Sequence, residues 1–295
     1  MGEINLYQVT KEGVAEITPE PVELEKKMQH LIEENLEEIL GIRFLDSEYG
    51  TGEKHGGRID TLGLDENDSP VIIEYKKTKN QNVINQGLYY FDWLVDHKAE
   101  FENLVRQEIN GDTEVDWSSP RLVCIAPDFT KYDSHAVEQI GQNIELMRFE
   151  RYSDGVLLLE LVNAVESEET GGDTPREYTT VGEKLGKADE RLKQIFDELD
   201  EFLLSLGDDV QKKELKYYYA YKTIRNFVSV EVRPTEGKLL LYLKIDPESV
   251  SGAPNNTRDV SEIGHYGTGD FEVTIAREED LEASKEYAQM SYERM

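Results

Sequence analysis

Residues 57–77 read GRIDTLGLDENDSPVIIEYKK and carry the strongest structural pattern in the chain. Two strand-like runs, residues 58–64 and 70–77, flank the breaker-rich DENDS, so the segment predicts a β-hairpin. In an antiparallel pair, the numbers of two facing residues add up to a constant. If the turn is centred on Asn67, residues at equal distances before and after it therefore face each other. This register places Asp60 opposite Glu74.

Side chains alternate between the two faces of a strand, so Glu74 and Lys76 share one face, with Asp60 opposite them. Two carboxylates opposed across strands repel, and a chain selected only for stability is expected to avoid this placement. A divalent cation removes the conflict, and carboxylate oxygens suit Mg²⁺ or Mn²⁺. The lysine could then orient or deprotonate a metal-bound water. The alternative is a surface hairpin with an ordinary Glu–Lys pair.

Asp60 followed by Glu74-Tyr75-Lys76 resembles the core motif of the PD-(D/E)XK nuclease superfamily in its GRID…E-x-K form. It is similar to the branch that contains the archaeal and actinobacterial mismatch and flap endonucleases, and the resemblance covers residues 1–165. The resemblance implies a restriction-endonuclease-like fold with an αβββαβ core. It also implies a Mg²⁺-dependent nuclease that hydrolyses phosphodiester bonds in DNA during repair, processing or defence.

A helix is predicted before the hairpin, over residues 22–40, with Gly41 as its stop. At about 100° per residue, Glu25 falls inside the apolar stripe of this helix and Glu33 outside it. An inward carboxylate is costly unless it is paired or binds metal, although a first-turn glutamate can also be solvated and favoured by the helix dipole. The resemblance implies a metal-site glutamate on this helix, with Glu25 as the candidate and Glu33 in reserve.

Residues 79–109 after the hairpin predict one long or two consecutive helices, with Gln86 facing inward beside aromatic residues. The resemblance implies that Gln86 holds the attacking water or the phosphate. The alternative is a buried amide bonded to the backbone. Between the first helix and the hairpin, the glycine-rich residues 44–57 predict a flexible loop.

Three basic residues near the hairpin are candidates for binding nucleic acid: Lys54, Arg58 and Lys77. With Asp60 and Glu74 as metal ligands and Lys76 and Gln86 as further catalytic residues, they complete the predicted site. The expected partner is DNA rather than RNA. A homodimer would be a convenient way to cut two strands, although no residue demands one.

The rest of the chain completes two domains. A buried strand, a short helix and two more strands follow up to residue 165, which predicts an α/β (α+β) domain with a mixed sheet flanked by helices. Residues 166–178 are acidic and breaker-rich and predict a linker. Residues 179–295 predict a smaller α+β domain with an antiparallel sheet, opened by a helix over residues 181–206.

This C-terminal part resembles an uncharacterised domain that often follows such nuclease-like domains, sometimes labelled "putative transport protein". The transport label has no support in a chain without a membrane-spanning segment. Residues 211–225 are the most basic segment, with lysines interleaved with tyrosines. They could bind nucleic acid, but we favour tyrosines that enter the core with solvated lysines outside.

The formal net charge of −30, from 62 acidic and 32 basic residues, excludes a protein whose whole surface attracts DNA. Basic groups confined to one groove, or high ambient salt, would reconcile this charge with a nuclease. The charge also supports a second hypothesis, a non-catalytic nucleic-acid or protein interaction module that retains the nuclease fold. The single Cys124, in an apolar run, and the N-terminal sequence predict a cytoplasmic protein without membrane association.

Overall fold

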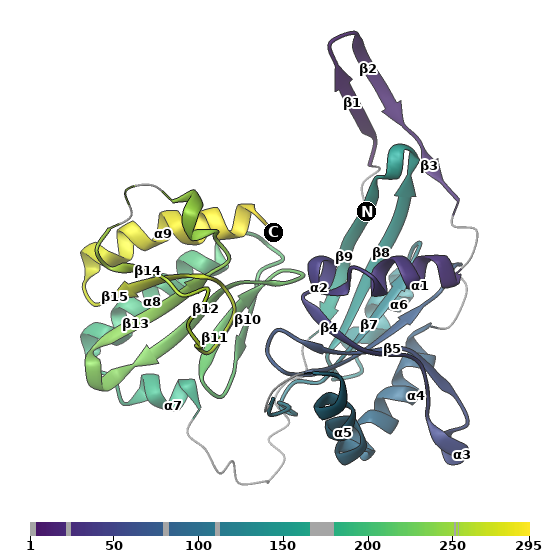
Figure 1. Ribbon diagram of the computed structural model, residues 1–295, viewed down its shortest axis with the longest axis horizontal. Coiled ribbons are helices and arrows are strands. Elements are labelled where there is room, and N and C mark those ends of the chain that lie inside the picture. The colour runs from purple at the N-terminus through teal and green to yellow at the C-terminus, as the bar shows by residue number, and fades with distance from the viewer. Residues whose placement is uncertain are drawn as a thin grey trace. The chain divides into compact units, whose positions relative to one another are not determined.

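The computed structural model describes residues 4–21, 25–78, 83–109, 113–165, 180–250, 252 and 254–295, without the side chain of Lys54. The chain divides into two compact units, Met1–Thr170 and Gly171–Met295 (Figure 1). Their boundary lies in the predicted linker, residues 166–178, which is outside the described residues. The predicted fold class is confirmed, with a mixed sheet in the first unit and an antiparallel sheet in the second.

In the first unit, seven strands of the described residues form a mixed sheet in the order β3-β8-β7-β6-β5-β4, with β9 paired to β8. The strands are β3 (Pro19–Glu20), β4 (Ile42–Gly50), β5 (Arg58–Asp65), β6 (Pro70–Tyr75), β7 (Arg121–Ala126), β8 (Ile144–Tyr152) and β9 (Leu157–Val165). Strands β6, β7 and β8 run parallel and the other neighbours antiparallel. A separate hairpin, β1 (Leu6–Thr10) and β2 (Gly13–Ile17), precedes the sheet.

The central hairpin has the predicted register, since Leu62 pairs with Ile72 and Leu64 with Pro70. The turn between the strands is closed by the side chain of Asp65, whose Oδ1 accepts two backbone N–H groups. Strand β6 is buried along its whole length, because β5 and β7 flank it and helices cover the sheet.

Helices cover both faces of this sheet. They are α1 (Glu25–Glu33), α2 (Leu36–Leu40), α3 (Gly52–His55), α4 (Val83–Asp96), α5 (Lys98–Glu108) and α6 (Lys131–Glu138), with the short 3-10 helix η1 (Ser153–Gly155). Helices α4, α5 and α6 share one apolar core with Leu62, Ile72 and Leu122 of the sheet. Helix α1 lies on the other face, where its Glu33 contacts Thr61. The parallel pairs β6–β7 and β7–β8 are joined through helices, as parallel strands require.

Two predictions for the helices and strands of the first unit are wrong. Residues 44–50, half of the loop expected at residues 44–57, belong to strand β4, which pairs along β5 and buries Ile42 and Leu45. The sequence pattern did not predict this strand because the glycines and charged residues of residues 44–57 are typical of a loop. An edge strand with one buried face needs few apolar residues. The predicted helix over residues 22–40 is also interrupted between α1 and α2, although Gly41 ends α2 in the left-handed conformation (φ 64°).

The second unit holds an antiparallel sheet of six described strands in the order β10-β11-β12-β13-β15-β14. The strands are β10 (Gln211–Glu214), β11 (Tyr218–Lys222), β12 (Asn226–Arg233), β13 (Lys238–Leu243), β14 (Thr257–Asp259) and β15 (Phe271–Ile275). The helices are α7 (Val181–Gly186), α8 (Glu190–Leu204) and α9 (Glu278–Glu293), with the short η2 (Pro234–Glu236) and η3 (Pro247–Ser249). The predicted helix over residues 181–206 is therefore two helices, because Asp189 caps the start of α8.

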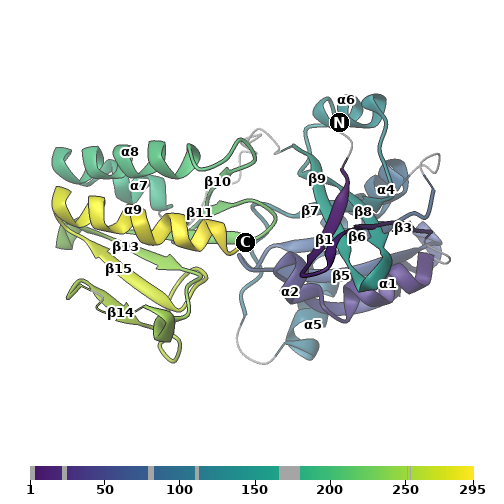
Figure 2. The same cartoon turned by 90° about the horizontal axis from the view of Figure 1, so that it is seen from above.

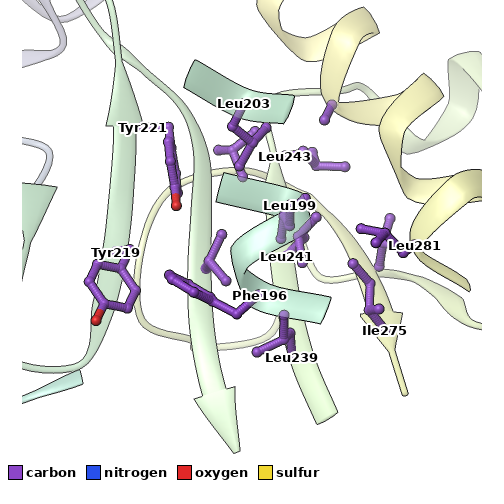
Figure 3. Close-up of a cluster of buried hydrophobic side chains, with 14 of the residues drawn as sticks. Phe196, Leu199, Leu203, Tyr219, Tyr221, Leu239, Leu241, Leu243, Ile275 and Leu281 are labelled. Atoms are coloured by element: carbon purple, nitrogen blue, oxygen red, sulfur yellow. The ribbon is translucent and has the colours of Figure 1, made fainter. Parts of the chain in front are cut away.

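Helices α8 and α9 lie side by side over one face of this sheet (Figure 2). Figure 3 shows Phe196, Leu199 and Leu203 of α8 packed against the strands. Tyr218, Tyr219 and Tyr221 of the basic segment are buried as predicted, whereas Tyr217 is only partly buried. Two of its lysines are not solvated as expected: Lys213 is 7% exposed and Lys222 2%. Along the residues that the structure describes, no helix has both the length and the apolar character needed to cross a membrane.

Candidate functional site

The predicted carboxylate pair forms where β5 and β6 stop pairing. The last Cα partners of the ladder are Thr61 and Ile73. One residue further, side chains replace the backbone ladder: the N–H of Asp60 donates to Oε1 of Glu74 (3.1 Å), and the N–H of Tyr75 donates to Oδ2 of Asp60 (3.0 Å). Each carboxylate is thus held by the main chain of the opposite strand.

Burial makes this pair electrostatically demanding. Glu74 is completely buried, and its burial, followed by the charge of Asp60, raises the pKa of Glu74 to about 9. Burial also raises the pKa of Asp60, against the opposing effects of the Tyr75 N–H and of Lys76. Ionising both carboxylates costs free energy, because they are desolvated and close together. The site therefore favours a shared proton or a bound cation.

Lys76, the first residue beyond β6, connects this pair to helix α1. Its side chain is 11% exposed, and its Nζ lies 4.0 Å from Oδ2 of Asp60 and 3.5 Å from Oε1 of Glu25. The Nζ also donates to the carbonyl oxygen of Tyr75 (2.7 Å). Lys76 is therefore held between two carboxylates and next to the predicted reacting centre.

Glu25 reaches the site through Lys76 and does not lie free in water. Besides the ion pair with Lys76, its Oε2 accepts the backbone N–H of Lys77 (3.0 Å). Its side chain is one-third exposed (32%). This geometry favours a role in holding Lys76, and the role of Glu25 as a metal ligand stays a prediction.

Gln86 lies where the sequence predicted. From the first turns of α4, its Nε2 donates to Oε2 of Glu74 at 2.6 Å. The alternative of an amide bonded to the backbone is not what the structure shows. Gln86 therefore fixes the orientation of the buried carboxylate.

The reserve candidate Glu33 lies on the opposite face of the sheet, and its expected position outside the apolar stripe is wrong. Its side chain is only 8% exposed. Its Oε1 accepts from Gln29 Nε2 (2.9 Å), Ser47 Oγ (2.9 Å) and Thr61 Oγ1 (2.6 Å). Gln29 also donates to the carbonyl oxygen of Asp60 (2.8 Å). This network supports the backbone of the site from behind.

Of the three predicted nucleic-acid contacts, the structure describes two. Arg58 has a 67% exposed side chain, and its Nη1 pairs with Oε2 of Glu48 (3.0 Å). Lys77 is exposed beside the site, whereas the side chain of Lys54 is outside the described part of the chain. The sequence reasoning missed Glu48 because β4 was read as a loop.

The arrangement supplies oxygen ligands for a small divalent cation. Within the described ranges, no group of three or more His, Cys, Asp and Glu side chains converges as a metal site. Mg²⁺ nevertheless usually takes one or two protein carboxylates and completes its shell with water and phosphate oxygens. Asp60 and Glu74 meet that requirement, and each carboxylate is oriented by a main-chain N–H of the opposite strand.

Comparisons with known proteins extend over both units. The model of a domain of unknown function (DUF5655) matches residues 181–293, which is almost the whole second unit. An uncharacterized protein of Haemophilus influenzae (strain ATCC 51907 / DSM 11121 / KW20 / Rd) is 26% identical, with 95% of this chain and 96% of that protein covered. No solved structure matches the chain.

Proposed function

We propose that the first unit is a Mg²⁺- or Mn²⁺-dependent nuclease that hydrolyses phosphodiester bonds in DNA. The observation that carries the proposal is the pair formed by the buried Glu74 and the partly buried Asp60, with the Nζ of Lys76 4.0 Å from Oδ2 of Asp60. Two carboxylates and an ammonium group at one end of a sheet are the groups needed to bind a cation and to assist a water nucleophile.

A divalent cation fits this site because it relieves the cost of the carboxylate pair. The raised pKa values of Asp60 and Glu74 result mainly from burial, and a cation between the two groups would restore their ionised forms. When bound, the metal lowers the pKa of a water ligand and offsets the charge of the phosphate.

The remaining side chains position these groups. Gln86 orients the carboxylate of Glu74, and Glu25 keeps the ammonium of Lys76 near Asp60. In this position Lys76 can stabilise negative charge on the phosphate or take part in proton transfer to and from the water. Lys77 and Arg58 are exposed nearby, where they can contact the phosphate backbone.

The choice of DNA depends on the resemblance of the Asp60…Glu74-x-Lys76 motif to PD-(D/E)XK nucleases. The order of elements α1, β4, β5, β6, α4 and β7 agrees with the αβββαβ core that this resemblance implies, and it supports the proposal. Because the net charge of the chain is −30, the attraction for DNA must come from the cationic groups beside the site and not from the surface as a whole.

The test is cleavage of labelled single-stranded, duplex, mismatched and flapped DNA with Mg²⁺ or Mn²⁺ across a salt series. The parent is compared with Asp60→Asn and Glu74→Gln. Asp92→Asn is the matched control, because Asp92 is exposed on α4 and loses the same charge. Cleavage by the parent and by Asp92→Asn, but not by the two site variants or in chelator, is expected. Equal cleavage by all four proteins would refute the proposal.

The high negative charge favours a second candidate function, a non-catalytic interaction module with the same fold. Calorimetric titration with Mn²⁺ separates the two. A nuclease requires metal binding that Glu74→Gln weakens, whereas absence of metal binding together with absence of cleavage would leave the interaction module.

A further inference from the structure

We propose that an aromatic and basic surface on the second unit binds single-stranded nucleic acid. This surface, here the tyrosine surface, consists of Lys184, Lys216, Tyr217, His265 and Tyr266. It is built from α7, the turn between β10 and β11, and the segment between β14 and β15. The choice of nucleic acid rests partly on the proposed function of the first unit, but binding can be measured without cleavage.

The centre of the tyrosine surface is a stacked pair. The rings of Tyr217 and Tyr266 have centroids 4.0 Å apart and planes 15° from parallel. Tyr266 remains 46% exposed, so the stack presents a large aromatic side chain to solvent. Exposed aromatic rings are platforms on which unpaired bases stack.

The segment that carries Tyr266 is anchored to the sheet. The N–H of Thr268 donates to Oγ of Ser229 (3.1 Å). Gly267 separates Tyr266 from Thr268 in the chain and has φ 91°. It lies so close to Ser229 that a Cβ on it would be 2.5 Å from the Cβ of Ser229. Only glycine tolerates both the conformation and the contact. Tyr266 is therefore presented from a fixed backbone, which lowers the entropy cost of binding.

Two cations flank the same stack. The Nζ of Lys216 lies 5.0 Å, and that of Lys184 5.5 Å, from the ring centroid of Tyr217. The nearby carboxylate of Glu214 is turned away into the start of α7, where it accepts from Thr180 Oγ1 (2.8 Å) and the N–H of Gly182 (3.2 Å). Positive charge beside aromatic rings in an otherwise acidic chain matches the alternation of phosphates and bases along a strand.

A second stack adjoins the first. The ring of His265 lies on Tyr242, with centroids 4.3 Å apart and planes 7° from parallel. Neighbouring residues of one loop thus carry two aromatic rings, one from each stack. Bases in a duplex already stack on each other and cannot use such platforms without being unpaired, so the surface fits single strands rather than duplexes.

The test is fluorescence anisotropy of a labelled oligothymidine of about 12 nucleotides, titrated with the full-length protein in chelator. Tyr266→Ala is expected to weaken binding about tenfold and Tyr266→Phe to preserve it. The control is Tyr132→Ala, because Tyr132 is 73% exposed and also has a lysine, Lys131, 5.1 Å from its ring centroid. Replacing Lys184 and Lys216 by Gln is expected to lower the salt slope of binding by about 0.7 per lost phosphate contact.

Equal binding by the parent, Tyr266→Ala and Tyr132→Ala would overturn the inference, as would a duplex that binds as tightly as the single strand. Failure of the parent to bind the oligonucleotide would also overturn it. The outcome is distinct from that of the nuclease proposal. Single-strand binding that depends on Tyr266, in a protein that never cleaves, supports this inference while refuting the nuclease. DNA cleavage by a protein whose single-strand binding does not depend on Tyr266 would support the nuclease and refute this inference.

Discussion

The backbone N–H of Asp60 donates to Oε1 of Glu74 at 3.1 Å, one residue beyond the last Cα pair between β5 and β6. With the reciprocal bond from the Tyr75 N–H to Asp60, it fixes both carboxylates through the main chain. An amide in place of either carboxylate keeps an oxygen that can accept the same bond. Asp60→Asn and Glu74→Gln are therefore expected to remove charge while preserving the local geometry.

The stability of the metal-free protein is expected to depend on pH through Glu74. Burial, and then Asp60, raise the pKa of Glu74 from 4.5 to about 9. Between these values the native protein keeps a proton that the unfolded chain has lost, so this contribution to stability is complete below about pH 4.5 and is lost as pH rises towards 9. The slope is at most about 1.4 kcal/mol per pH unit.

Urea unfolding in chelator at about pH 6 and about pH 8 measures this effect. The parent is expected to lose more unfolding free energy between the two pH values than Glu74→Gln, whose amide does not titrate. The same pH dependence in both proteins would show that Glu74 is not protonated in the metal-free site.

Lys76 and Lys77 are neighbours in the sequence with different expected roles. The ammonium of Lys76 is enclosed between Glu25 and Asp60, whereas the side chain of Lys77 is exposed. Lys76→Ala is expected to lower kcat of DNA cleavage by about 100-fold or more, the usual contribution of a group that assists proton transfer. Lys77→Ala is expected mainly to raise KM and reduce its salt dependence. Equal effects on kcat would contradict a catalytic role for Lys76.

Glu33 is expected to stabilise the site from the opposite face of the sheet. Its carboxylate accepts from Gln29, Ser47 and Thr61. Glu33→Met leaves these partly buried donors without their acceptor and is expected to cost about 1–3 kcal/mol of unfolding free energy. Urea unfolding beside Glu34→Met, at an exposed position of the same segment, provides the comparison. A loss of similar size in both variants would show that the network is not stabilising.

Arg121 holds two buried acids together. Its Nε lies 3.2 Å from Oδ2 of Asp65 and its Nη1 2.6 Å from Oε2 of Glu145, with a side chain only 3% exposed. Arg121→Met leaves both carboxylates buried without their partner and is expected to cost about 3–5 kcal/mol. Arg151→Met is the control, because its pair with Glu20 is half exposed and is expected to contribute about 1 kcal/mol or less. Thermal and urea unfolding measure both.

The local part of the candidate site could be predicted from the sequence because a hairpin is specified by neighbours. The turn residues and the alternation of side chains were enough to place Asp60 across from Glu74 and Lys76 beside them. Helical spacing was likewise enough to turn Gln86 inward. These relations depend on the short-range geometry of a strand pair and of one helix.

Other positions depended on contacts that no local pattern records. Glu33 is polar and was placed outside the apolar stripe, yet three donors from other parts of the chain make its burial favourable. Lys213 and Lys222 were expected in solvent, yet both are buried in the second sheet. A charged residue becomes an interior residue when distant partners satisfy it.

The sequence by itself determined the two-domain order, the central hairpin with its register and the residues that could share one face of it. The tertiary structure alone decided that residues 44–50 form an edge strand, that Glu25 meets Lys76, and that Tyr217 and Tyr266, far apart in the chain, form one stack. Periodicity reports how a segment is buried, but not against which segment. That choice is made by the packing of the whole chain, in which each buried polar group must find its partner.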